Sequence, residues 1–66
     1  MADYSVKYRM VDGSVIAQTV YGYFKGLRAL ADDITAYGFV THMNKNEDHA
    51  TIINNQHVLS VEVEQL

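Results

Sequence analysis

The chain has 66 residues, which suits one domain, and its five basic and eight acidic side chains give a net charge of −3. It has no cysteine, which excludes a disulfide scaffold, and 48% of its residues are hydrophobic, which argues against disorder. The negative charge argues against direct binding to nucleic-acid phosphates, but it is compatible with a partner that itself binds nucleic acid.

The N-terminal residues and the hydropathy of the chain bear on its location. Met1-Ala2-Asp3 begins no signal peptide, and no apolar run approaches the ~20 residues that cross a bilayer. We therefore expect a cytoplasmic protein. Because a chain this short buries a modest share of its surface, pairing of two copies is the most available additional source of stability.

The first part of the chain predicts a β-hairpin. Apolar and polar residues alternate from Tyr4 to Met10, and Asp12-Gly13 is a signal for a two-residue turn. A second strand is expected from Val15 to Tyr23. With the turn at Asp12-Gly13, one face of the hairpin is mostly apolar, which supports this register. The pairs on that face are Met10 with Val15, Tyr8 with Ala17, Val6 with Thr19, and Tyr4 with Tyr21.

One helix is expected from Leu27 to Tyr37. Its apolar residues recur at the helical spacing, which predicts one buried stripe. The stripe consists of Leu27, Leu30, Ala31 and Ile34. Gly38 stands where a left-handed residue would end the helix.

The opposite face of this helix combines small apolar residues with carboxylates. These residues are Ala29, Asp32, Asp33 and Ala36, with Tyr37 at the edge of the stripe. Such a face can be a solvated exterior. It can also be a docking face for a basic protein partner, and the residues alone leave both interpretations open.

The remainder of the chain predicts short strands at residues 39–43 and 49–53 and a clearer one at 57–64. The order is therefore ββα followed by two to three strands. We expect an α+β fold in a single domain, residues 1–66, with a small antiparallel sheet and the helix packed across one face. The last strand is expected to lie at the edge of the sheet. Its residues Leu59, Val61 and Val63 are therefore candidates for a dimer interface.

No group of residues indicates catalysis or a cofactor. His42, His49 and His57 match no metal-binding spacing, so we expect no metal. Asp32 and Asp33 are adjacent and diverge on a helix, so they cannot act together on one substrate atom. We therefore expect a protein that is not an enzyme and has no catalytic residues.

Several short motifs occur in an order that a known family shares. They are Tyr4-Ser5-Val6 at a strand start, Asp12-Gly13 in a turn, Tyr23-Phe24-Lys25-Gly26-Leu27 before the helix, Tyr37-Gly38 at its end, and an alternating last strand from Val58 to Leu66. In this order the chain resembles the very small inhibitors of uracil-DNA glycosylase made by certain Bacillus phages. The resemblance covers residues 4–38 and 57–66.

The resemblance implies a homodimer that acts on uracil-DNA glycosylase in the cytoplasm of a host bacterial cell. Members of this family mimic DNA: they block the DNA groove of the enzyme and capture the apolar side chain that it wedges into the duplex. Asp33 and Tyr37 match the acidic residue and the tyrosine that the family uses on its helix. The same build would also suit a phage or mobile-element protein that binds another host factor, such as a nuclease or polymerase.

The chain departs from the family pattern in three respects, one of which is an expected helix that is one residue longer. The family has a phenylalanine just before its acidic helix residue, where this chain has Asp32. Another apolar group must then receive the wedge, either the strip of Ala29 and Ala36 with Tyr37, or Ile34. Residues 41–56 look like an insertion that forms an extra hairpin.

Overall fold

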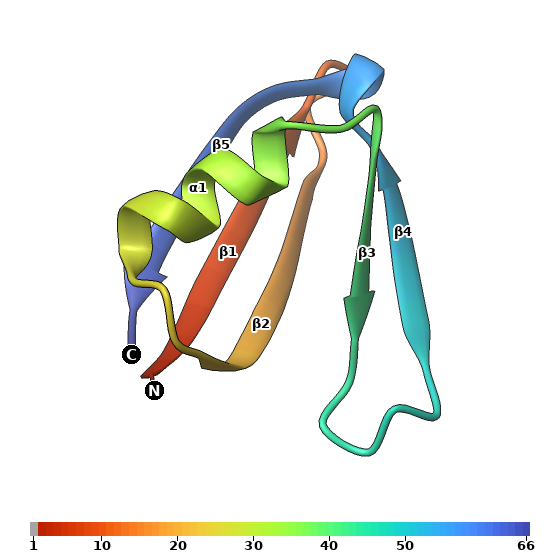
Figure 1. The fold of residues 1–66 in the computed structure, drawn as a ribbon. Coiled ribbons are helices and arrows are strands. Elements are labelled where there is room, and N and C mark those ends of the chain that lie inside the picture. Colours follow the sequence, from red (N-terminus) through yellow and green to blue (C-terminus); the bar gives the residue numbers. More distant parts are fainter. Residues whose placement is uncertain (1) are drawn as a thin grey trace.

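The computed structural model describes residues 2–66 and shows a three-stranded sheet, a helix across it and a separate β-hairpin (Figure 1). The elements in chain order are β1 (Ala2–Met10), β2 (Val15–Tyr23), α1 (Leu27–Thr35), β3 (Phe39–Met43), β4 (Ala50–Asn54), the 3-10 turn η1 (Asn55–His57) and β5 (Val58–Gln65). The α+β class and the single helix across one face of a small antiparallel sheet are confirmed. The strands are divided between two antiparallel sheets, whereas we had expected one.

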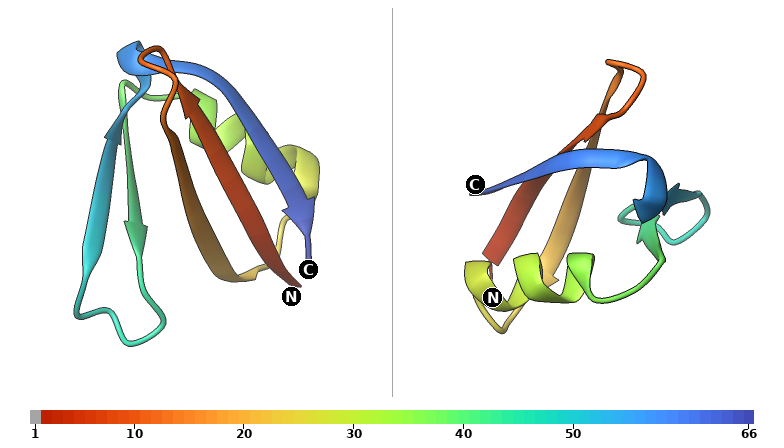
Figure 2. Two further views of the ribbon diagram at one scale, coloured as in Figure 1. Left: turned by 180° about the vertical axis from the view of Figure 1, so that it is seen from behind. Right: turned by 90° about the horizontal axis from the view of Figure 1, so that it is seen from above.

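Strand β1 is the centre of the larger sheet, whose order is β2-β1-β5. Tyr4, Val6 and Tyr8 alternate along β1 and are buried, so the predicted inner face is confirmed. Strand β5 lies at the edge of this sheet, as expected. Seen from behind, α1 lies on the far side of β1 and β5, and the hairpin stands beside the sheet (Figure 2).

The register of the first hairpin is one residue away from the predicted one. The loop has three residues, closed by a hydrogen bond from Met10 N–H to Ser14 O (2.8 Å) and another from Gly13 N–H to Met10 O (3.0 Å). Gly13 has φ +92, a left-handed conformation that suits glycine and that closes such three-residue loops. As a result Tyr8 lies opposite Ile16 and not opposite Ala17.

This shift changes which face of β2 joins the core. The predicted register placed Ile16 and Val20 on the outer face, but both pack against the buried residues of the core. The core itself comes from every layer of the fold, because Leu30 and Ile34 of α1 and Ile53 of β4 join the three buried residues of β1. The alternation of β1 was thus interpreted correctly although its pairing was not.

Helix α1 begins at Leu27 as predicted but ends at Thr35, two residues before the expected end. Gly26 precedes it with φ +96. Gly38 does not have the left-handed conformation that we predicted. Instead, the side-chain amide of Asn55 donates hydrogen bonds to the carbonyls of Ile34 (3.0 Å) and Tyr37 (2.5 Å), so a distant residue satisfies groups at the helix end.

Residues 39–54 form the β3–β4 hairpin, a two-stranded sheet of its own. Its inner face reaches the core through Ile53 and His42, which are both buried. At the base of the hairpin, Asn55 N–H donates to Gly38 O (2.9 Å). The expected extra hairpin is therefore present, held at its base and along one face.

Candidate functional site

The structure divides the predicted helix face into an exposed part and a part that contacts the rest of the fold. Asp32, Ala36 and Tyr37 are exposed, and Tyr37 retains 73% of its accessible surface. Ala29 is half-buried. Asp33 is exposed, but its carboxylate contacts β2, so the face consists chiefly of one carboxylate and one aromatic ring.

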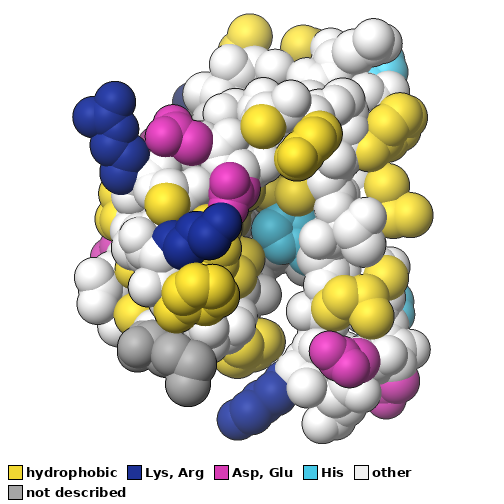
Figure 3. Space-filling model, in the orientation of Figure 1, with side chains coloured by type: hydrophobic (Ala, Val, Ile, Leu, Met, Phe, Trp, Pro, Cys, Tyr) yellow, Lys and Arg dark blue, Asp and Glu magenta, His cyan; other side chains and the backbone are white. Residues whose placement is uncertain are grey.

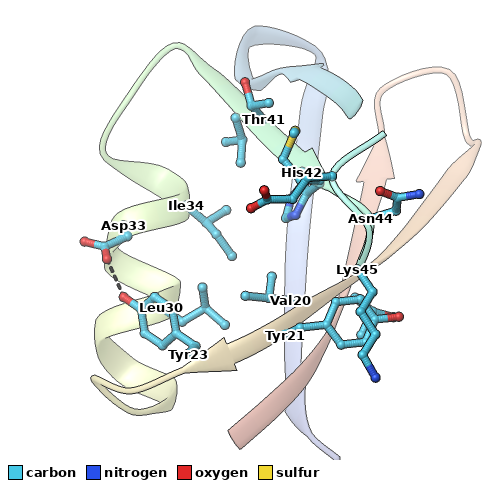
Figure 4. Close-up of a pocket in the computed structure, with 14 residues that line it drawn as sticks. Val20, Tyr21, Tyr23, Leu30, Asp33, Ile34, Thr41, His42, Asn44 and Lys45 are labelled. Atoms are coloured by element: carbon cyan, nitrogen blue, oxygen red, sulfur yellow. Dashed lines mark hydrogen bonds between the residues drawn. The ribbon is translucent and has the colours of Figure 1, made fainter. Parts of the chain in front are cut away.

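Asp33 accepts a hydrogen bond from the hydroxyl of Tyr23 at the end of β2 (Figure 4). This hydrogen bond, with a smaller contribution from desolvation, raises the pKa of Tyr23 to about 12. Tyr23 in turn packs edge-on against the buried Tyr4. The Asp33 carboxylate is therefore oriented by the sheet, which sequence reasoning missed.

Aromatic side chains that we did not select are exposed near both ends of α1. Phe24, just before the helix, retains 76% of its accessible surface and stacks on Tyr23 with ring centroids 6.3 Å apart. Phe39 follows the helix and is 62% exposed. Phe24 could have been selected from the sequence, because it belongs to the motif Tyr23-Phe24-Lys25-Gly26-Leu27 that precedes the helix. Exposed aromatic residues are common anchors in protein interfaces.

A cleft of about 350 Å³ separates β2 and α1 from the β3–β4 hairpin. The space-filling view shows the hollow between the helix side and the hairpin side of the molecule (Figure 3). Val20, Leu30 and Ile34 contribute apolar surface to it, while Asp33 and Lys45 contribute charges. The cleft exists because β2 is an edge strand of the larger sheet, while β3 belongs to the separate two-stranded sheet.

A buried polar contact joins the two sides behind this cleft. Tyr8 of β1 and His42 of β3 form a hydrogen bond between the hydroxyl and Nε2, and their rings meet edge-on with centroids 5.4 Å apart. Burial lowers the pKa of His42 and raises the pKa of Tyr8 to about 12. Both groups are therefore neutral at pH 7. His42 is therefore a structural residue of the interior.

The three histidines do not come together, since His42 is buried while His49 and His57 are exposed. In the part of the chain that the structure describes, no three side chains of His, Cys, Asp or Glu are grouped to hold a metal ion. No helix within residues 2–66 has the length and apolar character needed to cross a membrane.

The three residues proposed for a dimer interface occupy different environments. Val61 and Val63 are half-buried and pack against the core. Leu59 retains 69% of its accessible surface, beside an irregularity in the β1–β5 pairing between Arg9 and Met10. Leu59 is therefore the one of the three that presents a large apolar surface outward.

No protein-family model, curated protein or solved structure matches the chain.

Proposed function

We propose that the protein is a non-enzymatic inhibitor of uracil-DNA glycosylase that acts by DNA mimicry in the cytoplasm of a host bacterial cell. It occupies the DNA-binding groove of the enzyme and sequesters its apolar wedge residue. The protein acts as a homodimer, so that the twofold axis presents two copies of the binding face.

The observation that carries the proposal is the exposure of Asp32 on α1 and of Ala36 and Tyr37 directly after its last residue. A groove that binds DNA is basic, so a protein that enters it needs carboxylates in place of phosphates. It also needs an apolar surface for the wedge. Asp32 supplies the first, and the Tyr37 ring with the Ala36 methyl group supplies the second.

The burial of two candidate residues supports Tyr37 as the residue that receives the wedge. Ile34 is 3% exposed and lies in the core, so it offers no surface to a partner. Ala29 is half-buried and contributes little. Tyr37 is thus the principal apolar contact, and Phe24 or Phe39 can extend it at the ends of the helix.

The test compares inhibition of uracil release from DNA by the parent protein and by two variants, Asp32→Asn and Tyr37→Ala. Loss of an interface anchor costs about 2 kcal/mol or more, so Tyr37→Ala should weaken inhibition roughly thirtyfold. Asp32→Asn should slow association, and added salt should reduce the difference between it and the parent.

The matched control is Glu62→Gln, which removes one charge from an exposed position of β5 on the other side of the sheet. It should inhibit as the parent does, and circular dichroism should show all variants folded. If folded Asp32→Asn and Tyr37→Ala inhibit as well as the parent, this face is not the binding site.

The alternative is a phage or mobile-element protein that binds and modulates another host protein that processes nucleic acid. Gel filtration of the protein with the glycosylase distinguishes the two. A co-eluting complex supports inhibition of the glycosylase. Separate elution, together with a complex formed with a nuclease or polymerase, supports the alternative.

A further inference from the structure

The cleft between α1 and the β3–β4 hairpin is lined by apolar residues and by charged groups at its sides. Val20, Leu30 and Ile34 point into it from two elements (Figure 4). Its volume of about 350 Å³ is in the range of sites that hold small molecules or single side chains. A long side chain with an apolar stem would find matching surface in this interior.

One side of the cleft presents an oriented carboxylate. Asp33 lines the cleft, and the Tyr23 hydroxyl donates to its Oδ2. A carboxylate offers about four acceptor positions, so Asp33 can accept further hydrogen bonds while it is held by Tyr23. Glu47, on the loop between β3 and β4, adds a second negative charge to the lining.

The other side of the cleft already holds a cation against an aromatic ring. The ammonium group of Lys45 lies 5.9 Å from the ring centroid of Tyr21, within the range of a cation–π contact. Figure 4 shows Lys45 beside Tyr21, across the cleft from Asp33 and Tyr23. The chain thus places aromatic rings and carboxylates together around an apolar interior, which is an arrangement that suits cations with apolar stems.

We infer that this cleft receives an arginine side chain of the protein partner, with its aliphatic stem against the half-buried Val20 and Val40 and its guanidinium group hydrogen-bonded to Asp33. Arginine fits better than lysine because its planar group can donate two hydrogen bonds to one carboxylate and can stack on tyrosine. The net charge of −3 favours a basic partner. That this partner is the glycosylase depends on the proposed function, whereas the preference of the cleft for arginine does not.

Two neighbouring aspartates make the inference testable. Asp33 lines the cleft, while Asp32, about 100° around the helix, is exposed and is not among the lining residues. The variants Asp32→Asn and Asp33→Asn each remove one negative charge, and the two positions are adjacent in the chain. Asparagine also keeps an oxygen that can accept from Tyr23, so Asp33→Asn preserves this side of the cleft.

The experiment titrates the full chain with N-acetylargininamide and follows the backbone amide signals by NMR. N-acetylcitrullinamide, which has nearly the same shape without the charge, is the matched probe. The arginine probe should shift signals of residues that line the cleft, and the citrulline probe should bind at least roughly fivefold more weakly. Equal binding of the two probes, or no saturable binding of the arginine probe, overturns the inference.

The variants give effects of opposite direction. Asp33→Asn should weaken binding of the arginine probe roughly fivefold, whereas Asp32→Asn should change it less than about twofold. Lys45→Met removes a competing positive charge and should strengthen binding. Equal losses in the two aspartate variants, or tighter binding of spermidine than of the arginine probe, would also overturn it. Because no glycosylase is present, this result does not depend on whether the proposed function is correct.

Discussion

Tyr8 and His42 are 34 positions apart in the chain, and their side chains form a hydrogen bond in the interior of the protein. Tyr8 belongs to the central strand of the larger sheet, and His42 belongs to the hairpin. This contact therefore joins the hairpin to the sheet, and His42 also lines the cleft. The stability of the hairpin should depend on it more than on any exposed contact.

The variant Tyr8→Phe tests this connection. It keeps the ring and removes the hydroxyl, leaving Nε2 of the buried His42 without its partner. The free energy of unfolding should fall by about 1–3 kcal/mol, which denaturant titration can measure. Tyr21→Phe is the matched control, because the Tyr21 ring is exposed and the change should stay within about 0.5 kcal/mol. Equal effects of the two variants would contradict this role of Tyr8.

Stability should decline in mildly acidic solution because of His42. Burial lowers its pKa below the ordinary value of 6.5. Between the two pKa values the unfolded chain binds a proton that the folded chain does not, so the free energy of unfolding decreases as the pH falls through this window. We expect this pH dependence to weaken in His42→Leu, measured by denaturant titration at several pH values. A pH dependence that is unchanged in His42→Leu would contradict this role of His42.

The end of helix α1 should depend on Asn55. Its amide donates to the carbonyls of Ile34 and Tyr37. Asn55→Asp removes the donor and places a negative charge at the negative end of the helix dipole, so it should destabilise more than Asn55→Ala. A loss of about 1–3 kcal/mol is expected for the alanine variant. Hydrogen exchange should report faster exchange in the last turn, and protection equal to that of the parent would show that Asn55 is dispensable.

The proposed homodimer should depend on Leu59, the exposed apolar residue of the edge strand β5. We expect a dimer at micromolar concentration in analytical ultracentrifugation, and a shift toward monomer in Leu59→Glu. Ile52→Glu, which introduces the same charge at an exposed position of the hairpin, is the control and should remain dimeric. A parent protein that sediments only as a monomer would contradict the proposal.

The local patterns of the sequence predicted the inner face of β1 and, with the exception of the exposed Leu27, the inner face of α1, but they predicted neither the inner face of β2 nor its pairing. Tyr4, Val6 and Tyr8 lie inside in either register, because the inner face of a strand follows from its own alternation. Whether Val11 belongs to the loop depends on the left-handed conformation of Gly13, which converts a two-residue loop into a three-residue one. The residue types Asp12-Gly13 are compatible with both loops, so the pairing of β2 could not be decided from them.

For the candidate site, the sequence predicted which side chains are exposed but not the contacts that they make with other elements. The helical period correctly predicted that Asp32 of α1 and Ala36, which follows its last residue, are exposed. It could not show that Asp33 contacts Tyr23, because that depends on the approach of β2 to the helix after the chain has folded. Nor could it show the burial of His42, since a histidine in a short strand with polar neighbours has no periodic signal of its own.

The hydrogen bond between Asn55 and Gly38 brings the two ends of the β3–β4 segment together at one point of the framework. A segment that leaves and returns at the same place can change in length without moving the strands and helix to which it is attached. The hairpin is therefore the natural place for relatives of this chain to differ in size. Because it also forms one wall of the cleft, each such difference would reshape what the cleft admits while leaving the helix face as it is.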